Sequence, residues 1–342
     1  MISASVVVAA IQIFNGTGKY IMSDFETEDI AKKRAIQRAR EDAQDKAGVY
    51  LTSFSKTENA RLTADEISAV TNNIIDISDV EVQSEPFEVN GETGVIWTVT
   101  LKATIDPDGI FDFIKRDDKD KVTIVQQNKD LQDAIAKNDE LSASLTEQYN
   151  RATSQAERDR IREQMKKTDC DFLANQKNKD GLKLYYAKDY DGAIKLFDEA
   201  LELKPDYAEV YDNRGTCYAD LGQHERAIED FDKAIALNPN FLVYNNRGCS
   251  YFNLEQYEQA TQDLDKAIQL MPDFAASYIV RGCSYFKLEQ YERAIRDFDK
   301  VLELNPGHTT VYALRGYCHQ YLGDEAKAQA DFAKAKELGY NG

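Results

Sequence analysis

The sequence predicts three successive parts: an α+β domain over residues 1–115, a helical stalk over 116–172, and an all-α solenoid of five helix-turn-helix repeats over 173–342. Two β-rich stretches that follow a helical one indicate the first part. A polar segment without glycine or proline indicates the second. The third part depends on the strongest observation, a glycine that returns five times at spacings of 33 or 34 residues.

The N-terminal part begins with an apolar run over residues 1–14 that has no basic residue before Lys19. This run is shorter than a membrane span and lacks the positive start of a signal sequence. We therefore expect a buried strand, with a trimmed signal remnant as the alternative. The word NGTG at residues 15–18 predicts a turn at the end of this strand.

The rest of this part predicts two helices and two strands. A helix is expected over residues 26–53, and the capping box at residues 63–66 opens a second, shorter one. Residues 74–89 and 94–105 are rich in strand-forming residues, and Asn90–Gly91 between them is a hairpin signal. The result is a small antiparallel sheet with helices.

The stalk is expected to be one long helix from about residue 121 to 168. Its apolar residues follow a 4-3 spacing that is interrupted by Asn138 and Ser142. Either a coiled coil or a single helical spacer fits this impure seam, and the coiled coil would make the chain a homo-oligomer through residues 124–156. The seam consists of Leu131, Ile135, Leu145, Tyr149, Ala152 and Ala156.

Each repeat presents the same residue types at the same positions around its glycine. The glycine allows two helices to approach closely, a small residue marks their crossing, and a bulky apolar residue four positions later fills the hairpin. The glycines are Gly181, Gly215, Gly248, Gly282 and Gly316; the small residues are Ala193, Ala227, Ala260, Ala294 and Ala328; the bulky residues are Phe197, Phe231, Leu264, Phe298 and Phe332. Pro205, Pro239, Pro272 and Pro306 then end the second helix.

These repeated motifs resemble those of the tetratricopeptide repeat (TPR) family over about half of the chain. The resemblance implies a solenoid whose first helices line a concave surface that binds a peptide or protein partner. Carried over residue by residue, the candidate partner-binding residues are Tyr185, Tyr186, Asn213, Asn246, Phe252, Asn253, Phe286, Lys287, Tyr317 and Tyr321. The alternative is that Phe252 and Phe286 only pack between repeats. The Lys/Arg set with which some family members hold a C-terminal carboxylate is not evident.

A repeated arginine stands directly before four of the glycines, as Arg214, Arg247, Arg281 and Arg315. We expect these arginines to pair with acidic residues of neighbouring hairpins. Cys217, Cys249, Cys283 and Cys318 also recur once per repeat, which favours a structural role over a disulfide framework or a zinc site.

The N-terminal words GTGKYIMSDFETEDIAKKRAIQRAREDAQDKAGVYL, LTADEI and VIWTVTLKATID resemble the small α+β domain of bacterial envelope and flagellar-accessory lipoproteins. This resemblance implies an extracytoplasmic location, in the periplasm or cell envelope. A cytoplasmic location is the alternative.

The charge and the missing motifs exclude several functions. The net charge is −18 and no block of the chain is basic, so we expect no nucleic-acid partner. The three histidines have no partners at triad or metal spacing, and the Asp106–Gly109 word lacks the glutamate that completes a calcium loop. We expect no catalytic residue, metal, cofactor or small-molecule substrate.

The sequence thus favours a non-enzymatic scaffold or adaptor that captures a peptide or protein on the concave repeat surface. One alternative is a structural envelope component that binds through the N-terminal domain. The other is a cytoplasmic assembly factor or cochaperone.

Overall fold

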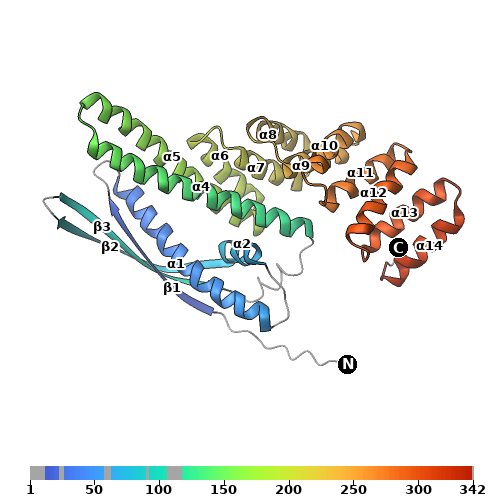
Figure 1. Ribbon diagram of the computed structural model, residues 1–342, viewed down its shortest axis with the longest axis horizontal. Helices are drawn as coiled ribbons and strands as arrows, with labels where there is room; N and C mark the ends of the chain where they lie inside the picture. The colour runs from blue at the N-terminus through green and yellow to red at the C-terminus, as the bar shows by residue number, and fades with distance from the viewer. Residues whose placement is uncertain (1–11, 23–26, 58–62, 90–91, 106–117, 341–342) are drawn as a thin grey trace. The chain divides into compact units, whose positions relative to one another are not determined.

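The computed structural model describes residues 12–22, 27–57, 63–89, 92–105 and 118–340. The chain forms two compact units, Met1–Lys179 and Asp180–Gly342. Figure 1 shows the sheet and long helices of the first unit and the helical hairpins of the second. Within the described residues, no helix combines the length and apolar content needed to cross a membrane.

The sheet of the N-terminal unit has three antiparallel strands in the order β1-β3-β2. The strands are β1 (Gln12–Met22), β2 (Ile75–Val89) and β3 (Glu92–Ile105). The two later strands confirm the expected antiparallel pair, while the expected turn at Asn90–Gly91 and the Asp106–Gly109 word lie outside the described residues, as do residues 1–11 of the expected first strand.

One face of this sheet packs against α1 (Glu28–Thr57). Alanines at every fourth position of α1 are buried, and the strand side chains opposite them are small or apolar. The alanines are Ala31, Ala35, Ala39, Ala43 and Ala47, and the strand residues include Val99, Leu101 and Ala103. The short alanine side chains bring the helix backbone very near the sheet.

This close packing corrects the prediction of a turn at residues 15–18. The NGTG word lies in the middle of β1, where Gly16 pairs with Leu101 and Gly18 with Val99. A Cβ atom on Gly16 would lie 2.1 Å from the Ala39 carbonyl oxygen, and one on Gly18 would lie 2.3 Å from that of Ala35. The glycines are therefore present because the helix leaves no room for a side chain, and not because the chain turns.

Side chains of α1 also occupy the free edge of β1. Arg38 Nη1 donates to the Lys19 carbonyl at 2.8 Å and Lys46 Nζ to the Asn15 carbonyl at 2.8 Å. Between them, Asp42 accepts the Thr17 N–H at 2.8 Å. The three side chains are four residues apart in α1, a rise of about 6 Å, and their partners are two residues apart in β1, a rise of about 6.6 Å. The contacts therefore stay in register along the edge. These contacts satisfy main-chain groups that an open edge would offer to another strand.

The predicted capping box is confirmed at the start of α2 (Ala64–Ile74). The Thr63 N–H donates to Glu66 Oε2 at 2.7 Å, and the Glu66 N–H donates to Thr63 Oγ1 at 3.2 Å. Helix α2 contacts α1 and α4 (Asp118–Arg151).

The prediction of one continuous helix from 121 to 168 was wrong. The chain leaves α4 at Arg151 and begins α5 (Gln155–Tyr186) after three residues, so the two helices fold into a hairpin. Asn138 Nδ2 donates to the Thr168 carbonyl at 2.7 Å across this hairpin. Leu145 and Ala152 form a buried cluster with Ile161 and Met165 of α5. The apolar seam is therefore buried within one chain, and an oligomer through residues 124–156 would have to displace these contacts.

The second unit consists of five helical hairpins, the first of which uses the C-terminal part of α5. The predicted domain boundary at residue 172 and the observed unit boundary at Lys179 both lie inside this helix. The remaining helices are α6 (Tyr190–Leu203), α7 (Ala208–Asp220), α8 (His224–Leu237), α9 (Phe241–Asn253), α10 (Tyr257–Leu270), α11 (Ala275–Lys287), α12 (Tyr291–Leu304), α13 (Thr309–Tyr321) and α14 (Glu325–Glu337).

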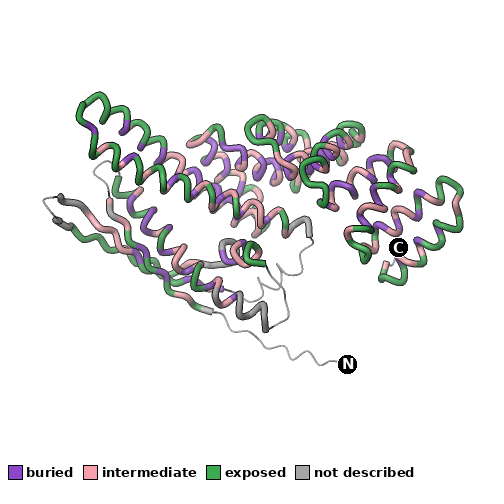
Figure 2. The backbone as a smooth tube through the Cα atoms, in the orientation of Figure 1, coloured by how far each residue is buried: buried purple, intermediate pink, exposed green. Residues whose placement is uncertain are grey.

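The repeated glycines have the role that the sequence predicts. A Cβ atom at any of the five would lie within 2.9 Å of the bulky residue of its own second helix, for example 2.8 Å from the Phe231 ring at Gly215. Phe197, Phe231, Leu264 and Phe298 are fully buried. Figure 2 shows the resulting buried interior of each hairpin, with exposed residues at the hairpin turns.

Candidate functional site

The first helices of the hairpins form one continuous layer. Helix α7 contacts α9, α9 contacts α11, and α11 contacts α13. Polar bonds join the layer: Asn246 Nδ2 donates to Asp212 at 3.2 Å, and Ser277 Oγ donates to Asn245 at 3.0 Å. We call the solvent-facing side of these helices the first-helix surface; the candidate partner-binding residues belong to these helices.

The N-terminal end of the first-helix surface is occupied by contacts within the chain. Tyr185 donates its hydroxyl hydrogen to Asp220 of the next hairpin at 3.0 Å, and its ring lies edge-on to Tyr186 at 5.2 Å. Burial, with the neighbouring Asp220 charge, raises the pKa of Tyr185 far above its usual range. Asn213 is only 4% exposed, and the Asn246 amide is bonded to Asp212. The Asn213 side chain is therefore buried and that of Asn246 half-buried, and their role in binding a partner stays a prediction.

The C-terminal end is more open. Tyr321 is 64% exposed and Tyr317 is 42% exposed, whereas Phe252 and Phe286 are half-buried. Asn253 is exposed, although its Nδ2 donates to the Cys249 carbonyl at 2.9 Å, and Lys287 is exposed as well. The predicted set is therefore accessible mainly over the last three hairpins.

Three further tyrosines belong to this surface, and sequence reasoning missed them because they begin the second helices. Tyr190, Tyr257 and Tyr291 are each the first residue of a second helix. Each packs its ring against an aromatic residue near the end of the preceding first helix, at centroid distances of 5.5 to 5.7 Å. The signal was present in the word LEQY, which occurs in two repeats.

Phe286, Tyr291 and Tyr321 form what we call the C-terminal aromatic cluster. Tyr291 and Tyr321 stack with centroids 5.0 Å apart and planes 9° apart. Phe286 lies edge-on to both rings at 5.5 Å. The cluster joins two consecutive hairpins and leaves most of the Tyr321 ring in solvent.

The repeated arginines of the first helices each bind two aspartates of successive second helices, and we call this series the arginine ladder. Arg247 donates two bonds to Asp263 at 2.7 Å and one to Asp232 of the preceding hairpin at 2.5 Å. Burial alone lowers the pKa of Arg247, but the bonds and charges of the two aspartates raise it by more. Equivalent triads are Asp198–Arg214–Asp230, Asp265–Arg281–Asp297 and Asp299–Arg315–Asp331. The predicted pairing is confirmed, and it includes an aspartate of the same hairpin.

The repeated thiols lie in an environment that disfavours reactivity. Burial raises the pKa of Cys217 to about 12, that of Cys283 to about 11 and that of Cys318 to about 12. Such thiols stay protonated near neutral pH and are poor nucleophiles and metal ligands. In the part of the chain that the structure describes, no group of three or more His, Cys, Asp or Glu side chains is placed to hold a metal ion.

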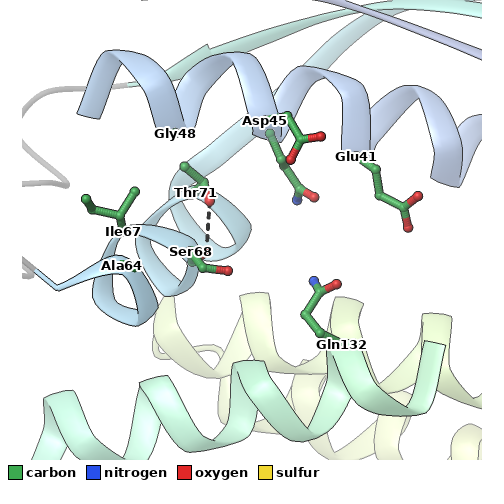
Figure 3. A pocket seen from close by; sticks show the side chains of 9 residues that line it. Glu41, Asp45, Gly48, Ala64, Ile67, Ser68, Thr71 and Gln132 are labelled. Atoms are coloured by element: carbon green, nitrogen blue, oxygen red, sulfur yellow. Dashed lines mark hydrogen bonds between the residues drawn. The ribbon is translucent and has the colours of Figure 1, made fainter. Parts of the chain in front are cut away.

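The N-terminal unit contains a cavity of about 230 Å³ between α1, α2 and α4. Figure 3 shows Glu41 and Asp45 of α1, Ser68 and Thr71 of α2, and Gln132 of α4 around it. Burial raises the pKa of Glu41, and a hydrogen bond from Gln37 opposes this rise. The lining is polar and acidic.

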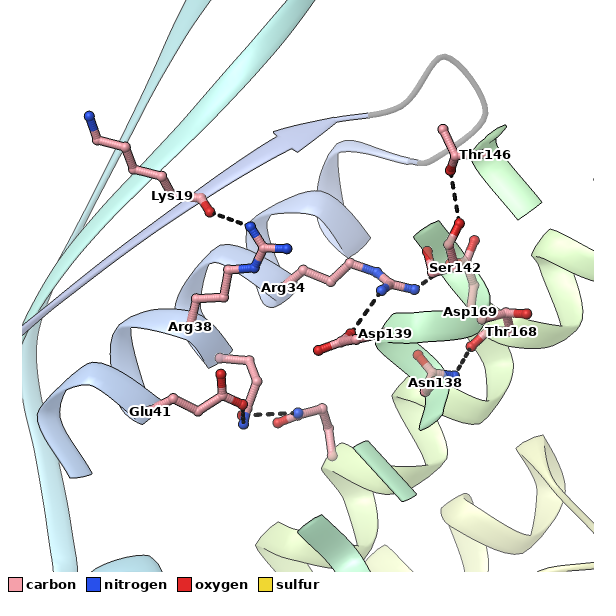
Figure 4. Close-up of polar contacts among 12 residues, drawn as sticks. Lys19, Arg34, Arg38, Glu41, Asn138, Asp139, Ser142, Thr146, Thr168 and Asp169 are labelled. Carbon is pink, nitrogen blue, oxygen red and sulfur yellow. Dashed lines mark hydrogen bonds and ion pairs between the residues drawn. The ribbon is translucent and has the colours of Figure 1, made fainter. Parts of the chain in front are cut away.

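A buried arginine of α1 connects this helix with α4 and α5. The Arg34 side chain is 3% exposed and pairs with Asp139 of α4 at 3.3 Å and with Asp169 of α5 at 3.2 Å. Its guanidinium also lies 4.8 Å from the centre of the Phe172 ring. Figure 4 shows the contacts of Arg34 with the two aspartates beside the Arg38 bond to β1. Burial raises the pKa of both aspartates, and the Arg34 charge opposes this rise.

Comparison with known families places every hairpin of the second unit in one class. Models described as "Tetratricopeptide repeat" match residues 208–241, 242–274, 275–308 and 309–338, and one described as "TPR repeat" matches residues 181–222.

Two similar proteins each match about a fifth of the chain. Small glutamine-rich tetratricopeptide repeat-containing protein 2 of Mycosarcoma maydis is 37% identical over 68 residues, which are 20% of this chain and 19% of that protein. Hsp70-Hsp90 organizing protein of Triticum aestivum is 36% identical over 69 residues, 20% of this chain and 12% of that protein. The match thus spans less than a fifth of each relative. A crystal structure of MamA protein is 26% identical, covers 48% of this chain and 91% of its own, and has a TM-score of 0.46.

Proposed function

Because residues 181–338 are tetratricopeptide repeats, we propose that the chain is a non-enzymatic adaptor that holds a peptide segment of a partner protein on its first-helix surface. The observation that carries this proposal is the exposure of the C-terminal aromatic cluster. Tyr321 is 64% exposed although its ring packs against Tyr291 and Phe286. Rigid, exposed aromatic rings are frequent anchors in protein interfaces.

The relatives support the same class of function. Their names describe tetratricopeptide repeat proteins and an organizing protein for Hsp70 and Hsp90. Repeat arrays share one scaffold and differ in the residues of their binding surface, so the identity of the partner has to come from this chain's own residues.

An experiment on the full chain tests this function. A Phe286→Ala/Tyr321→Ala variant is compared with a Leu237→Ala/Leu270→Ala control, which removes exposed apolar side chains from the ends of α8 and α10. Partners are captured from an extract of the native cells, identified and purified, and their affinities are measured by calorimetry. Losing two interface anchors should weaken binding by about thirtyfold or more. Equal binding by both variants would refute the role of the surface.

A second candidate places binding in the N-terminal unit, because the cavity beside Glu41 and Gln132 is a recess among its described residues. In that case the repeats would be structural. Partner binding that survives the Phe286→Ala/Tyr321→Ala change and is lost with Gln132→Trp, which fills the cavity, would favour this candidate.

For location, we propose the periplasm or cell envelope of a bacterium, with the cytoplasm as the alternative for an assembly factor or cochaperone. The resemblance of the N-terminal words to envelope and flagellar-accessory lipoprotein domains supports the first. Protease accessibility of the protein in intact and permeabilised native cells tests it. Protection until the inner membrane is opened would refute an extracytoplasmic location.

A further inference from the structure

The C-terminal aromatic cluster and the acidic turns beside it point to a specific chemistry, and we propose that the cluster receives an arginine or lysine side chain of a basic, extended partner peptide. This inference rests on the proposed function, since it names the partner chemistry of the same surface. It concerns the third to fifth hairpins, between α9 and α13.

The rings of the cluster present a face suited to a cation. One face of Tyr321 is covered by Tyr291, which is stacked at 5.0 Å, and the side chain is still 64% exposed. Its other face is therefore open to solvent. The face of an aromatic ring carries a negative quadrupole that attracts guanidinium and ammonium groups within about 6 Å of the ring centre. The structure already contains such contacts, for example Arg293 at 3.9 Å from the Tyr285 ring.

Carboxylates stand next to these rings. Glu289 occupies the turn between α11 and α12, with a φ of 58°, and its charge contributes, after burial, to the raised pKa of Tyr291. Glu255 holds the equivalent position, with a φ of 61°, beside the Phe252–Tyr257 pair. Both side chains are exposed, and neither forms an ion pair within residues 118–340 of the structure. An aromatic face beside an unneutralised carboxylate favours a cation over an anion.

Neighbouring basic side chains do not occupy this site. Arg281 is bonded to Asp297 and Asp265 in the ladder. Arg293 donates to the Tyr285 hydroxyl and to Gln290. Lys287 is the one basic residue among the candidate partner-binding residues, and a single lysine does not make a receptor for an acidic peptide.

The test uses the full chain and three fluorescein-labelled peptides of about twelve residues. The peptides share leucine and serine positions and differ at two sites, which carry Arg, Gln or Glu. Anisotropy at physiological salt should show the Arg peptide binding about tenfold more tightly than the Gln peptide, with the Glu peptide weakest.

Matched variants locate the effect. Tyr321→Phe keeps the aromatic face and should retain the Arg-over-Gln preference, whereas Tyr321→Leu keeps an apolar side chain and should remove it. Glu289→Gln should reduce the preference about threefold. Glu303→Gln removes the same charge at the far end of α12, about 20 Å along the helix, and should leave the preference unchanged.

The outcomes separate this inference from the proposed function. Equal affinity for the Arg and Gln peptides, or tightest binding of the Glu peptide, with binding still lost in Phe286→Ala/Tyr321→Ala, would overturn the cation site and leave the peptide-binding surface standing. A preference that is identical in Tyr321→Phe, Tyr321→Leu and Glu289→Gln would also overturn it, because the charge of the whole protein would then explain it. No binding of any peptide would contradict both.

Discussion

The arginine ladder allows a sharp test of which charges stabilise the repeats. Arg247 binds two aspartates, and these differ greatly in exposure: the Asp263 side chain is 8% exposed and that of Asp232 is 55% exposed. The Asp263→Ala and Asp232→Ala variants therefore remove chemically identical partners of one guanidinium from two different environments. Both sites lie in helices, so the gain in helix propensity from alanine is similar and cancels in the comparison.

The expected magnitudes follow from burial. Removing one partner of a buried ion pair costs about 3–5 kcal/mol, because the remaining charge is left in a poor environment. Asp232 would still neutralise part of the Arg247 charge, so we expect about 2–3 kcal/mol for Asp263→Ala. An exposed pair contributes about 0.2–1 kcal/mol, and Asp232→Ala should cost no more. A double variant, Arg247→Met/Asp263→Leu, should recover much of the loss because it leaves no buried charge unpaired.

Urea unfolding measures these differences with a control inside the same chain. Far-UV circular dichroism follows the helices, and Trp97, the one tryptophan in the sequence, lies in β3 and follows the N-terminal unit. Asp263→Ala should shift the helical transition and leave the Trp97 transition in place. Equal shifts for Asp263→Ala and Asp232→Ala, or a cost below about 1 kcal/mol for both, would refute the claim that burial decides the contribution.

Three further predictions concern the N-terminal unit, and Trp97 fluorescence during urea unfolding measures each. Gly16→Ala should destabilise it by about 3 kcal/mol or more through the clash with the Ala39 carbonyl, whereas Gly48→Ala, with only a 4.0 Å contact, should be neutral or stabilise α1. Leu145→Ala should lower the free energy of unfolding by about 2–4 kcal/mol and leave the mass measured by light scattering unchanged. If the variant instead converts an oligomer to a monomer, the intermolecular coiled coil would be supported. Burial raises the native pKa of Glu41. The contribution of protonated Glu41 to the free energy of unfolding is therefore complete below about pH 4, and it is lost as the pH rises through that native pKa. Glu41→Gln should therefore gain stability relative to the wild type between pH 4 and 7, and a relative loss over that range would contradict the assignment.

The repeats could be predicted closely because their contacts are local and repeat with the sequence. A glycine and its bulky partner are 16 residues apart in every hairpin, and so are most of the arginine–aspartate pairs. A contact at a fixed separation leaves a periodic trace in the sequence. The second-helix tyrosines escaped notice because they lie outside the first helices, and only three of the five repeats have them.

Two predictions for the N-terminal half were wrong, because one motif was assigned to a turn and one capping signal was overlooked. The NGTG word favours a turn when it is considered alone, and only the packing of α1 makes these glycines necessary in a strand. In the stalk, the break between α4 and α5 contains neither glycine nor proline. A capping signal was present, however, since the Glu157 N–H donates to Ser154 Oγ at 3.3 Å and Glu157 Oε2 accepts the Thr153 N–H at 3.3 Å.

The hairpin of α4 and α5 also shows why the sequence separated a stalk from the N-terminal domain. Arg34 reaches its two partners over 105 and 135 residues of sequence, so no local pattern connects it with Asp139 and Asp169. Considered alone, the two aspartates look like ordinary exposed charges of a polar helix. Their role exists only once α1 lies against the hairpin and brings a buried guanidinium with it. Where a polar contact is unique and distant, composition and periodicity describe the helices correctly and still misassign the unit to which they belong.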